Sequence, residues 1–109
     1  MKVNELLNIA NLSPLCMPEP DREVRGAYIG DLLSWVMGRA KADDAWITIM
    51  SNQNILAVAS LADVACIILA EGVTLEDNIL ATAKEKGINI LCGEKDAFSI
   101  AAALASELL

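Results

Sequence analysis

From residue 45 onward, apolar runs of strand length alternate with longer segments in which apolar residues recur every three or four positions. The apolar runs cover residues 45–50, 64–69 and 88–92, and the helical segments cover residues 52–62, 75–86 and 96–109. This alternation predicts consecutive βα units. The second and third runs are apolar at nearly every position, which is typical of strands covered on both faces in a parallel sheet.

The first 44 residues follow a different pattern. Residues 1–13 predict an amphipathic helix, and three prolines within residues 14–20 then interrupt regular structure. Residues 23–29 alternate enough to predict a strand, and a helix over 32–40 follows it. Because this half is not a simple βα repeat, we expect extra strands there. The sequence therefore predicts an α/β fold, a single three-layer α/β/α domain over residues 1–109 with a mixed, mostly parallel sheet.

The composition fits one domain of this kind. Hydrophobic residues make up 55% of the 109 residues but aromatic residues only 4%, so the core must consist mainly of Ala, Leu, Ile and Val. The longest apolar stretch, residues 55–70, contains Ser60 and Asp63 and is shorter than the roughly 20 residues of a spanning helix. We expect no membrane-spanning segment and a cytoplasmic location.

Charge and cysteine content exclude further classes. Fifteen acidic and eight basic residues give a formal charge of −7, which repels a phosphate backbone and makes nucleic acid an unsuitable partner. The three cysteines, Cys16, Cys66 and Cys92, are odd in number and far apart. This spacing predicts reduced thiols and neither a disulfide framework nor a four-thiolate metal site. We expect no metal and no cofactor.

The best candidate site lies where the predicted strands end. Ligands of open α/β sheets collect beyond the carboxyl ends of the strands, beside helix N-termini. The loop at 51–54 is the strongest candidate there, and the loops at 70–74 and 92–95 are weaker ones. The predicted ligand- or partner-binding residues are Ser51, Asn52, Gln53, Asn54, Glu71, Gly72 and Thr74.

Each loop also has a purely structural interpretation. Ser51 or Asn52 would cap the helix that follows, as Asp31 and Thr74 would cap theirs. Glu71 and Gly72 would form the turn that reverses the chain. Both interpretations stay open from the sequence.

The sequence lacks the usual catalytic groups. It contains no histidine, no GxSxG element and neither the Walker A nor the GxGxxG pattern. Asp43 and Asp44 are adjacent in a predicted solvated turn, which ordinary exposure explains better than an acid–base role. The sequence therefore predicts that the chain is not an enzyme.

The two tryptophans, Trp35 and Trp46, are half of the aromatic residues. No basic residues interleave with them, so we expect them to pack in the core or in a dimer interface, not to stack on bases. The large apolar content of so short a chain favours a homodimer.

Four segments of the chain together resemble the DRTGG domain family. They are VRGAYIGDLLS at 24–34, AWITI at 45–49, NILAVA at 54–59 and IILAEG at 67–72. The resemblance implies an α/β domain similar to the N-terminal domain of HPr kinase/phosphorylase. It also implies a regulatory role, because such domains occur as inserts in phosphotransacetylases and CBS-containing pyrophosphatases. The family's Asp-Arg-Thr position is held here by residues 51–53 and its Gly-Gly position by residues 71–72, so only Gly72 is retained.

The sequence thus favours a non-catalytic regulatory or ligand-sensing module of a metabolic system, which acts through dimerisation and strand-end loops. The alternative, implied by stand-alone relatives, is an accessory subunit that docks onto an iron-hydrogenase or another redox enzyme without a small ligand. An iron–sulfur carrier is a third hypothesis, and it requires Cys16, Cys66 and Cys92 to converge.

Overall fold

One five-stranded sheet organises the protein. The computed structural model describes the whole chain, Met1–Leu109. The strands are β1 (Ser13–Cys16), β2 (Gly26–Ile29), β3 (Asp44–Thr48), β4 (Cys66–Leu69) and β5 (Ile90–Cys92), in the order β1-β5-β4-β3-β2. β1 runs antiparallel to β5, and the other neighbours are parallel. The prediction of a mixed, mostly parallel sheet is confirmed.

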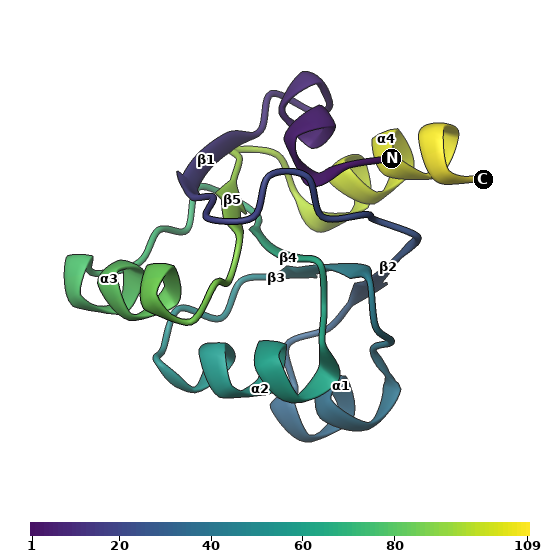
Figure 1. The fold of residues 1–109 in the computed structure, drawn as a ribbon. Coiled ribbons are helices and arrows are strands. Elements are labelled where there is room, and N and C mark those ends of the chain that lie inside the picture. The colour runs from purple at the N-terminus through teal and green to yellow at the C-terminus, as the bar shows by residue number, and fades with distance from the viewer.

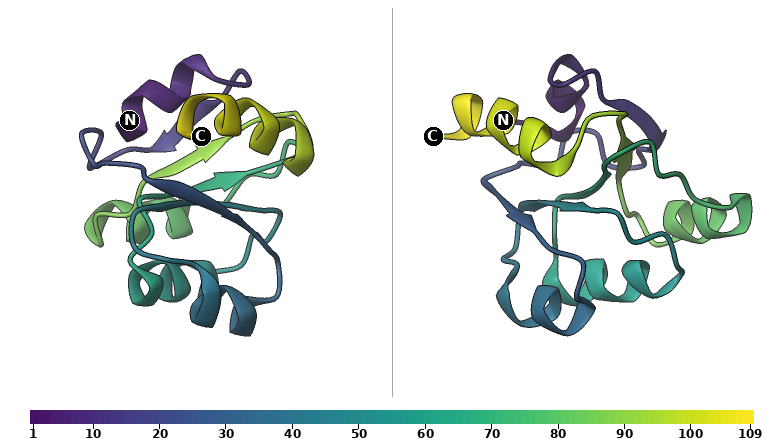
Figure 2. Two further views of the ribbon diagram at one scale, coloured as in Figure 1. Left: turned by 90° about the vertical axis from the view of Figure 1, so that its right-hand side faces the viewer. Right: turned by 180° about the vertical axis from the view of Figure 1, so that it is seen from behind.

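Helices cover both faces of the sheet (Figure 1). One layer holds α1 (Leu33–Arg39), α2 (Asn54–Ala62) and α3 (Asp77–Glu85). The opposite layer holds α4 (Ala97–Leu108) and the 3₁₀ helix η1 (Val3–Asn8), which lie side by side in Figure 2. The predicted three layers are therefore present. None of the helices has both the length and the apolar character needed to cross a membrane.

The central strands are apolar at every position because both of their faces are covered. In β4, Cys66 and Ile68 belong to the core beneath η1 and α4, whereas Ile67 and Leu69 belong to the core beneath α1, α2 and α3. All four side chains are fully buried. Successive residues of a strand point to opposite faces, so a continuous apolar run is what this position requires.

The N-terminal prediction was correct only in part. The expected amphipathic helix is a short 3₁₀ helix that buries Val3 and Leu6. β1 follows it and contains Pro14, which a sheet tolerates at its edge because proline has no N–H to donate.

Three predicted helix caps were wrong. The N-cap positions of α1, α2 and α3 are Leu32, Gln53 and Glu76, and none of them makes a side-chain capping bond. Only α4 begins with such a bond, in which the Asp96 carboxylate accepts from the Ser99 N–H at 2.9 Å. Asp31 does not cap α1, because its carboxylate is bound to the end of β3.

Residues 17–25 cross the amino ends of the strands to link β1 with β2, which lie at opposite edges of the sheet (Figure 1). Polar side chains before the strands hold this segment. Asn89 binds the backbone of Glu19, and the Arg22 guanidinium contacts Asp63 Oδ1 at 2.9 Å and Asp43 Oδ1 at 3.3 Å.

The predicted solvated turn at Asp43 and Asp44 is therefore wrong. Asp43 forms ion pairs with Arg22 and Arg25. Asp44 is the first residue of β3, is buried, and accepts a hydrogen bond from the Lys41 N–H at 2.8 Å. Both carboxylates therefore have structural partners: Asp43 binds two arginines of the crossing segment, and Asp44 binds the turn that precedes β3.

The three cysteines are free thiols. Cys66 packs against the core on the α4 side, whereas Cys16 and Cys92 pack on the α3 side, so the sheet separates them. This separation contradicts the convergence that an iron–sulfur carrier requires.

We expect Ellman's reagent to modify Cys16 and Cys92 in the folded protein and Cys66 only after unfolding. Burial raises the pKa of the fully buried Cys66 to about 12, and burial also raises the pKa of the two half-buried thiols. The thiolate is the reacting species, so all three react slowly and Cys66 slowest. Equal rates for the three thiols in native protein would contradict the buried placement of Cys66.

Candidate functional site

The carboxyl ends of the parallel strands β2 to β5 meet along one edge of the sheet. The loops that leave them comprise residues 30–32, 49–53, 70–76 and 93–96. Since β3 pairs with β4, the first two predicted loops leave adjacent strands. We call the exposed surface of the 49–53 and 70–76 loops, together with Asn54, the strand-end surface.

Ser51, Asn52, Gln53 and Asn54 are all exposed at the start of α2. Only the Asn52 side chain is engaged within the chain, where its Oδ1 accepts from the Asn54 N–H at 2.9 Å. The Leu56 N–H donates to the Gln53 carbonyl at 3.1 Å, so the loop backbone forms the first turn of the helix. The remaining polar side-chain atoms of this loop face solvent and can bind a ligand.

Glu71 and Gly72 form a strained turn after β4, with φ values of 57° and 75°. Their N–H groups donate to the carbonyls of Lys95 and Gly93, both at 2.9 Å. A Cβ at position 72 would lie 2.9 Å from Glu94 Oε2. The positive φ favours glycine here, whereas the exposed Glu94 side chain could move away from an added Cβ. The structure thus joins the β4–α3 loop to the β5–α4 loop, while Thr74 is exposed beyond the turn.

Asp31 is a residue at this edge that sequence reasoning assigned to the wrong role. Its Oδ1 accepts from Thr48 Oγ1 at 2.8 Å and from the Ile49 N–H at 2.9 Å. These bonds connect the β2–α1 loop to the loop that contains Ser51. The available signal was Thr48, a polar residue in a buried run, because a buried hydroxyl needs a partner.

Acidic residues dominate the four loops. Asp31, Glu71, Glu94 and Asp96 are all exposed, and Lys95 is the cation among them. Hydrogen bonds from Ser99 lower the pKa of Asp96, so its carboxylate is charged at neutral pH. A ligand bound here would meet hydrogen-bonding groups and negative charge, which suits a neutral or cationic group better than a polyphosphate.

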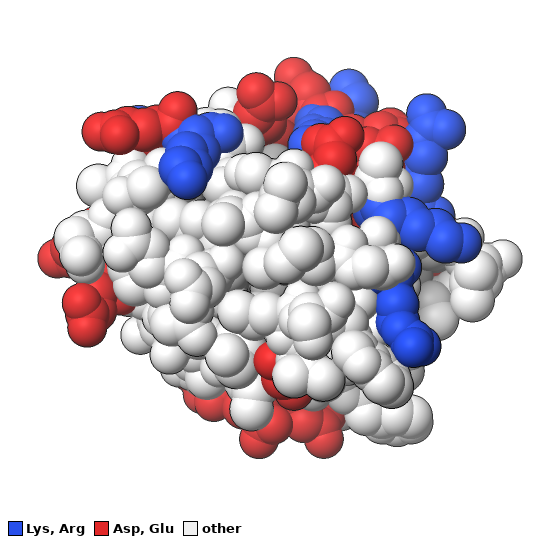
Figure 3. All heavy atoms as spheres, turned by 90° about the horizontal axis from the view of Figure 1, so that it is seen from below, with Lys and Arg blue, Asp and Glu red and all other residues white.

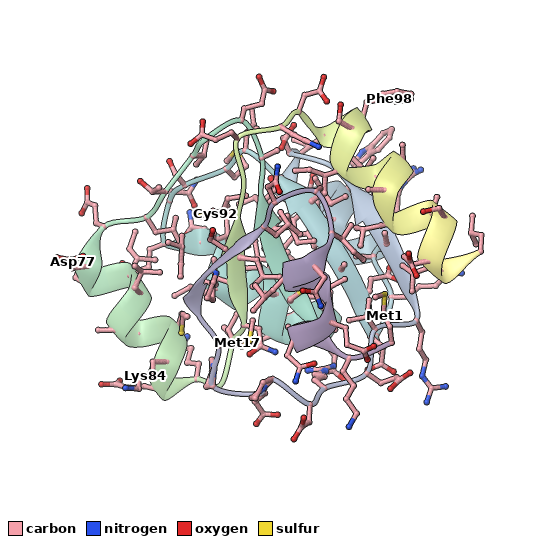
Figure 4. The ribbon with its side chains drawn as sticks, turned by 90° about the horizontal axis from the view of Figure 1, so that it is seen from above. Met1, Met17, Asp77, Lys84, Cys92 and Phe98 are labelled. Atoms are coloured by element: carbon pink, nitrogen blue, oxygen red, sulfur yellow. The ribbon has the colours of Figure 1, made fainter.

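The strand-end surface is open. Four surface hollows all lie elsewhere, among them one of about 540 Å³ between β1 and α3 and a smaller apolar one between β2 and α4. In Figure 4, Asp77 and Lys84 mark the two ends of α3 beside the first hollow, with Met17 near the helix. None of these hollows is lined by a predicted site residue. No group of three His, Cys, Asp or Glu side chains is arranged to hold a metal ion.

The fold and these loops define a small three-layer α/β domain with an exposed polar edge at its strand ends. The sequence model of the DRTGG domain matches residues 18–106, most of the chain. The protein therefore belongs to the DRTGG domain family, and the resemblance inferred from the sequence is confirmed.

A solved structure supports the same fold. The CBS and DRTGG domains of the regulatory region of Clostridium perfringens pyrophosphatase, complexed with the activator diadenosine tetraphosphate, match with a TM-score of 0.74 at 16% identity. The match covers 94% of this chain and 45% of that chain, so this protein spans less than half of the relative's length. No curated protein sequence matches the chain.

Proposed function

We propose that this protein is a non-catalytic regulatory module that senses a small polar ligand at the strand-end surface. Its family membership supports the regulatory role, since the pyrophosphatase region of similar fold is a regulatory one bound to an activator. The absence of histidine and of the usual nucleophile and phosphate-binding patterns agrees with a role other than catalysis.

The observation that carries this proposal is that polar side chains after β3 are exposed and have no hydrogen-bond partner within the chain. Ser51, Gln53 and Asn54 are exposed and make no side-chain hydrogen bonds within the chain, although their backbone forms an ordered turn. They occupy or adjoin the position of the family's Asp-Arg-Thr element. Free donors and acceptors on a rigid helix start need little reordering to bind a ligand.

The charge of the surface narrows the ligand class. Glu71 and Glu94 flank Gly72, and the Arg of the family element is replaced by Asn52. A nucleoside or another neutral polar molecule therefore fits this surface better than a tetraphosphate. Diadenosine tetraphosphate, the activator bound to the pyrophosphatase region, is therefore included in the test as a comparison compound and is not assumed to be the ligand of this protein.

The test is a thermal-shift and NMR titration with adenosine, AMP, diadenosine tetraphosphate, acetyl phosphate and a hexose phosphate. A ligand at about 100 times its Kd raises the free energy of unfolding by about 2.7 kcal/mol. We expect adenosine to shift the amide resonances of residues 51–54 and to bind more tightly than the tetraphosphate.

The matched variants are the pair Gln53→Ala with Asn54→Ala, and Ser106→Ala as the control. Ser106 is also an exposed polar residue of a helix, but it lies near the end of α4, in the opposite layer. We expect the pair to weaken binding at least about tenfold and the control to leave it unchanged. If no compound changes the melting temperature or the amide resonances, ligand sensing is wrong and docking onto a partner enzyme becomes the better hypothesis.

We also propose that the module is a homodimer. The motivation is its large apolar content, part of which stays exposed in the single chain. A metabolic or redox enzyme as a further partner remains a prediction from the family resemblance.

A further inference from the structure

Two copies of this chain, we propose, associate through the exposed surface of α1 and α2. We define this α1–α2 face by Leu32 and by the exposed, uncharged residues of both helices other than Asn54: Ser34, Trp35, Met37, Gly38, Ala57, Ser60 and Leu61. The proposal rests on the homodimer proposed above and assigns its surface, its symmetry and its coupling to the strand-end surface.

The α1–α2 face is almost free of charge. The two helices lie side by side below the sheet in Figure 1, and Arg39 is the one charged residue in them. Figure 3 looks at the molecule from this side and shows a broad uncharged area with Lys, Arg, Asp and Glu around its rim. The charge of the chain is therefore concentrated away from this face.

The face also exposes large apolar side chains. Leu32 is 60% exposed, Trp35 54%, Met37 47% and Leu61 70%. Trp35 is held against the Arg39 guanidinium, which lies 3.9 Å from the ring centroid. A tryptophan ordered before binding loses little conformational freedom in an interface, and tryptophan and arginine are the residue types that contribute most to binding there.

Charge selects a second copy as the occupant. Each copy carries a formal charge of −7, so two copies repel each other least when they meet through a face that lacks acidic groups. In a two-fold arrangement with antiparallel α1 helices, Asp31 at the start of one helix approaches Arg39 at the end of the other, and the reverse pair forms by symmetry. The opposite charges at the two ends of α1 would therefore pair between the two copies.

The area is sufficient for a stable dimer. A specific interface of ordinary size buries about 800 Å² on each partner. The chain exposes 5669 Å² and measures 32 × 26 × 25 Å, so one broad face can supply that area. The partner would cover most of the α1–α2 face.

The face is continuous with the strand-end surface. α2 begins at Asn54, directly after the loop with Ser51, and extends to Leu61 within the face. Asp31 is bound to the same loop through the Ile49 N–H and directly precedes Leu32. A ligand that moves this loop would alter the dimer contact, and by linkage dimerisation would alter ligand affinity equally.

Sedimentation of the full chain over a concentration series tests the proposal. We expect the wild type to shift from a mass of 11.6 kDa toward twice that value, with a Kd of roughly micromolar order. Trp35→Glu and, separately, Leu61→Glu are expected to raise the Kd at least about 100-fold, because each places like charges across the two-fold axis. Far-UV circular dichroism verifies that both variants fold.

Phe98→Glu is the matched control. Phe98 is 79% exposed on α4, in the opposite layer, so this change adds the same charge and removes a similar exposed aromatic group. We expect it to dimerise like the wild type. A monomeric wild type at the highest concentration, dimerisation of Trp35→Glu at wild-type affinity, or equal loss of the dimer in Phe98→Glu would each overturn the proposal.

The outcome is independent of ligand sensing. Sedimentation is done without ligand, and the titration proposed above can be repeated on a folded monomeric Trp35→Glu variant. Wild-type dimerisation with no ligand response would overturn only the sensing role. A ligand response in a monomeric wild type would overturn the homodimer and its α1–α2 interface but not the sensing role.

Discussion

Replacing Trp46 by alanine is expected to destabilise the protein by about 4 kcal/mol, a large part of the roughly 5–15 kcal/mol that stabilises a domain. Trp46 lies in the interior strand β3, fully buried beneath α1 and α2. Its Nε1 donates to the Gly30 carbonyl at 2.9 Å. The alanine variant leaves a cavity in the core and removes the donor that ties the end of β2 to β3.

Urea unfolding followed by far-UV circular dichroism measures this effect. Trp46→Phe should cost less, because it keeps most of the apolar contact and loses mainly the hydrogen bond. Phe98→Ala is the control, since this side chain is 79% exposed and its loss should change stability by less than about 0.5 kcal/mol. A cost below about 1.5 kcal/mol for Trp46→Ala would contradict the buried position of the indole.

Asn89→Ala is expected to cost about 3 kcal/mol, although the residue is small and polar. Asn89 is 1% exposed, directly before β5. Its Oδ1 accepts from the Glu19 N–H at 2.9 Å, and its Nδ2 donates to the carbonyls of Glu19 and Ala65 at 2.8 and 3.1 Å. Alanine leaves these three backbone groups without their partner and releases the crossing segment from the sheet.

The Asn89→Asp variant separates hydrogen bonding from packing. At neutral pH the introduced carboxylate faces two carbonyl oxygens, so this variant should be at least as unstable as Asn89→Ala. Burial and the carbonyls raise the folded-state pKa of the introduced carboxyl, so its protonated form is favoured by folding. The stability deficit relative to wild type should therefore grow as pH rises and shrink as pH falls toward about 4.

Asn78→Ala is the control for this pair, because Asn78 is exposed on α3. Denaturant midpoints of all four proteins, measured from acidic to neutral pH, give the comparison. A pH-independent deficit for Asn89→Asp would show that the amide donors of Asn89 do not matter.

Local patterns were sufficient for much of the fold. The βα alternation, the runs that became β3, β4 and β5, and the mixed character of the sheet follow from side-chain periodicity and from prolines near the N-terminus. Trp46 and Trp35 show the limit of such patterns. Sequence placed both in a core or an interface, but only the structure distinguished the buried indole from the half-exposed one.

The candidate site was predictable to the level of its loops. Parallel strands end at one edge, so the sequence placed residues 51–54 and 71–74 at that edge, and the observed pairing of β3 with β4 made their loops neighbours. The link from Gly72 to the β5–α4 loop and the true role of Asp31 could not be derived. Both depend on contacts between segments that are 17 to 24 residues apart in sequence.

The sequence by itself determined that this chain is a three-layer α/β protein of the DRTGG family, because periodicity and short segments that resemble the family are local properties. Tertiary structure alone decided where its polar groups find partners. Asn89 and Arg22 bind the crossing segment, Asp31 binds β3, and α1 and α2 together leave a face without charge. A hydrogen bond or an exposed face depends on which distant residues meet in space, and a pattern along the chain does not record that.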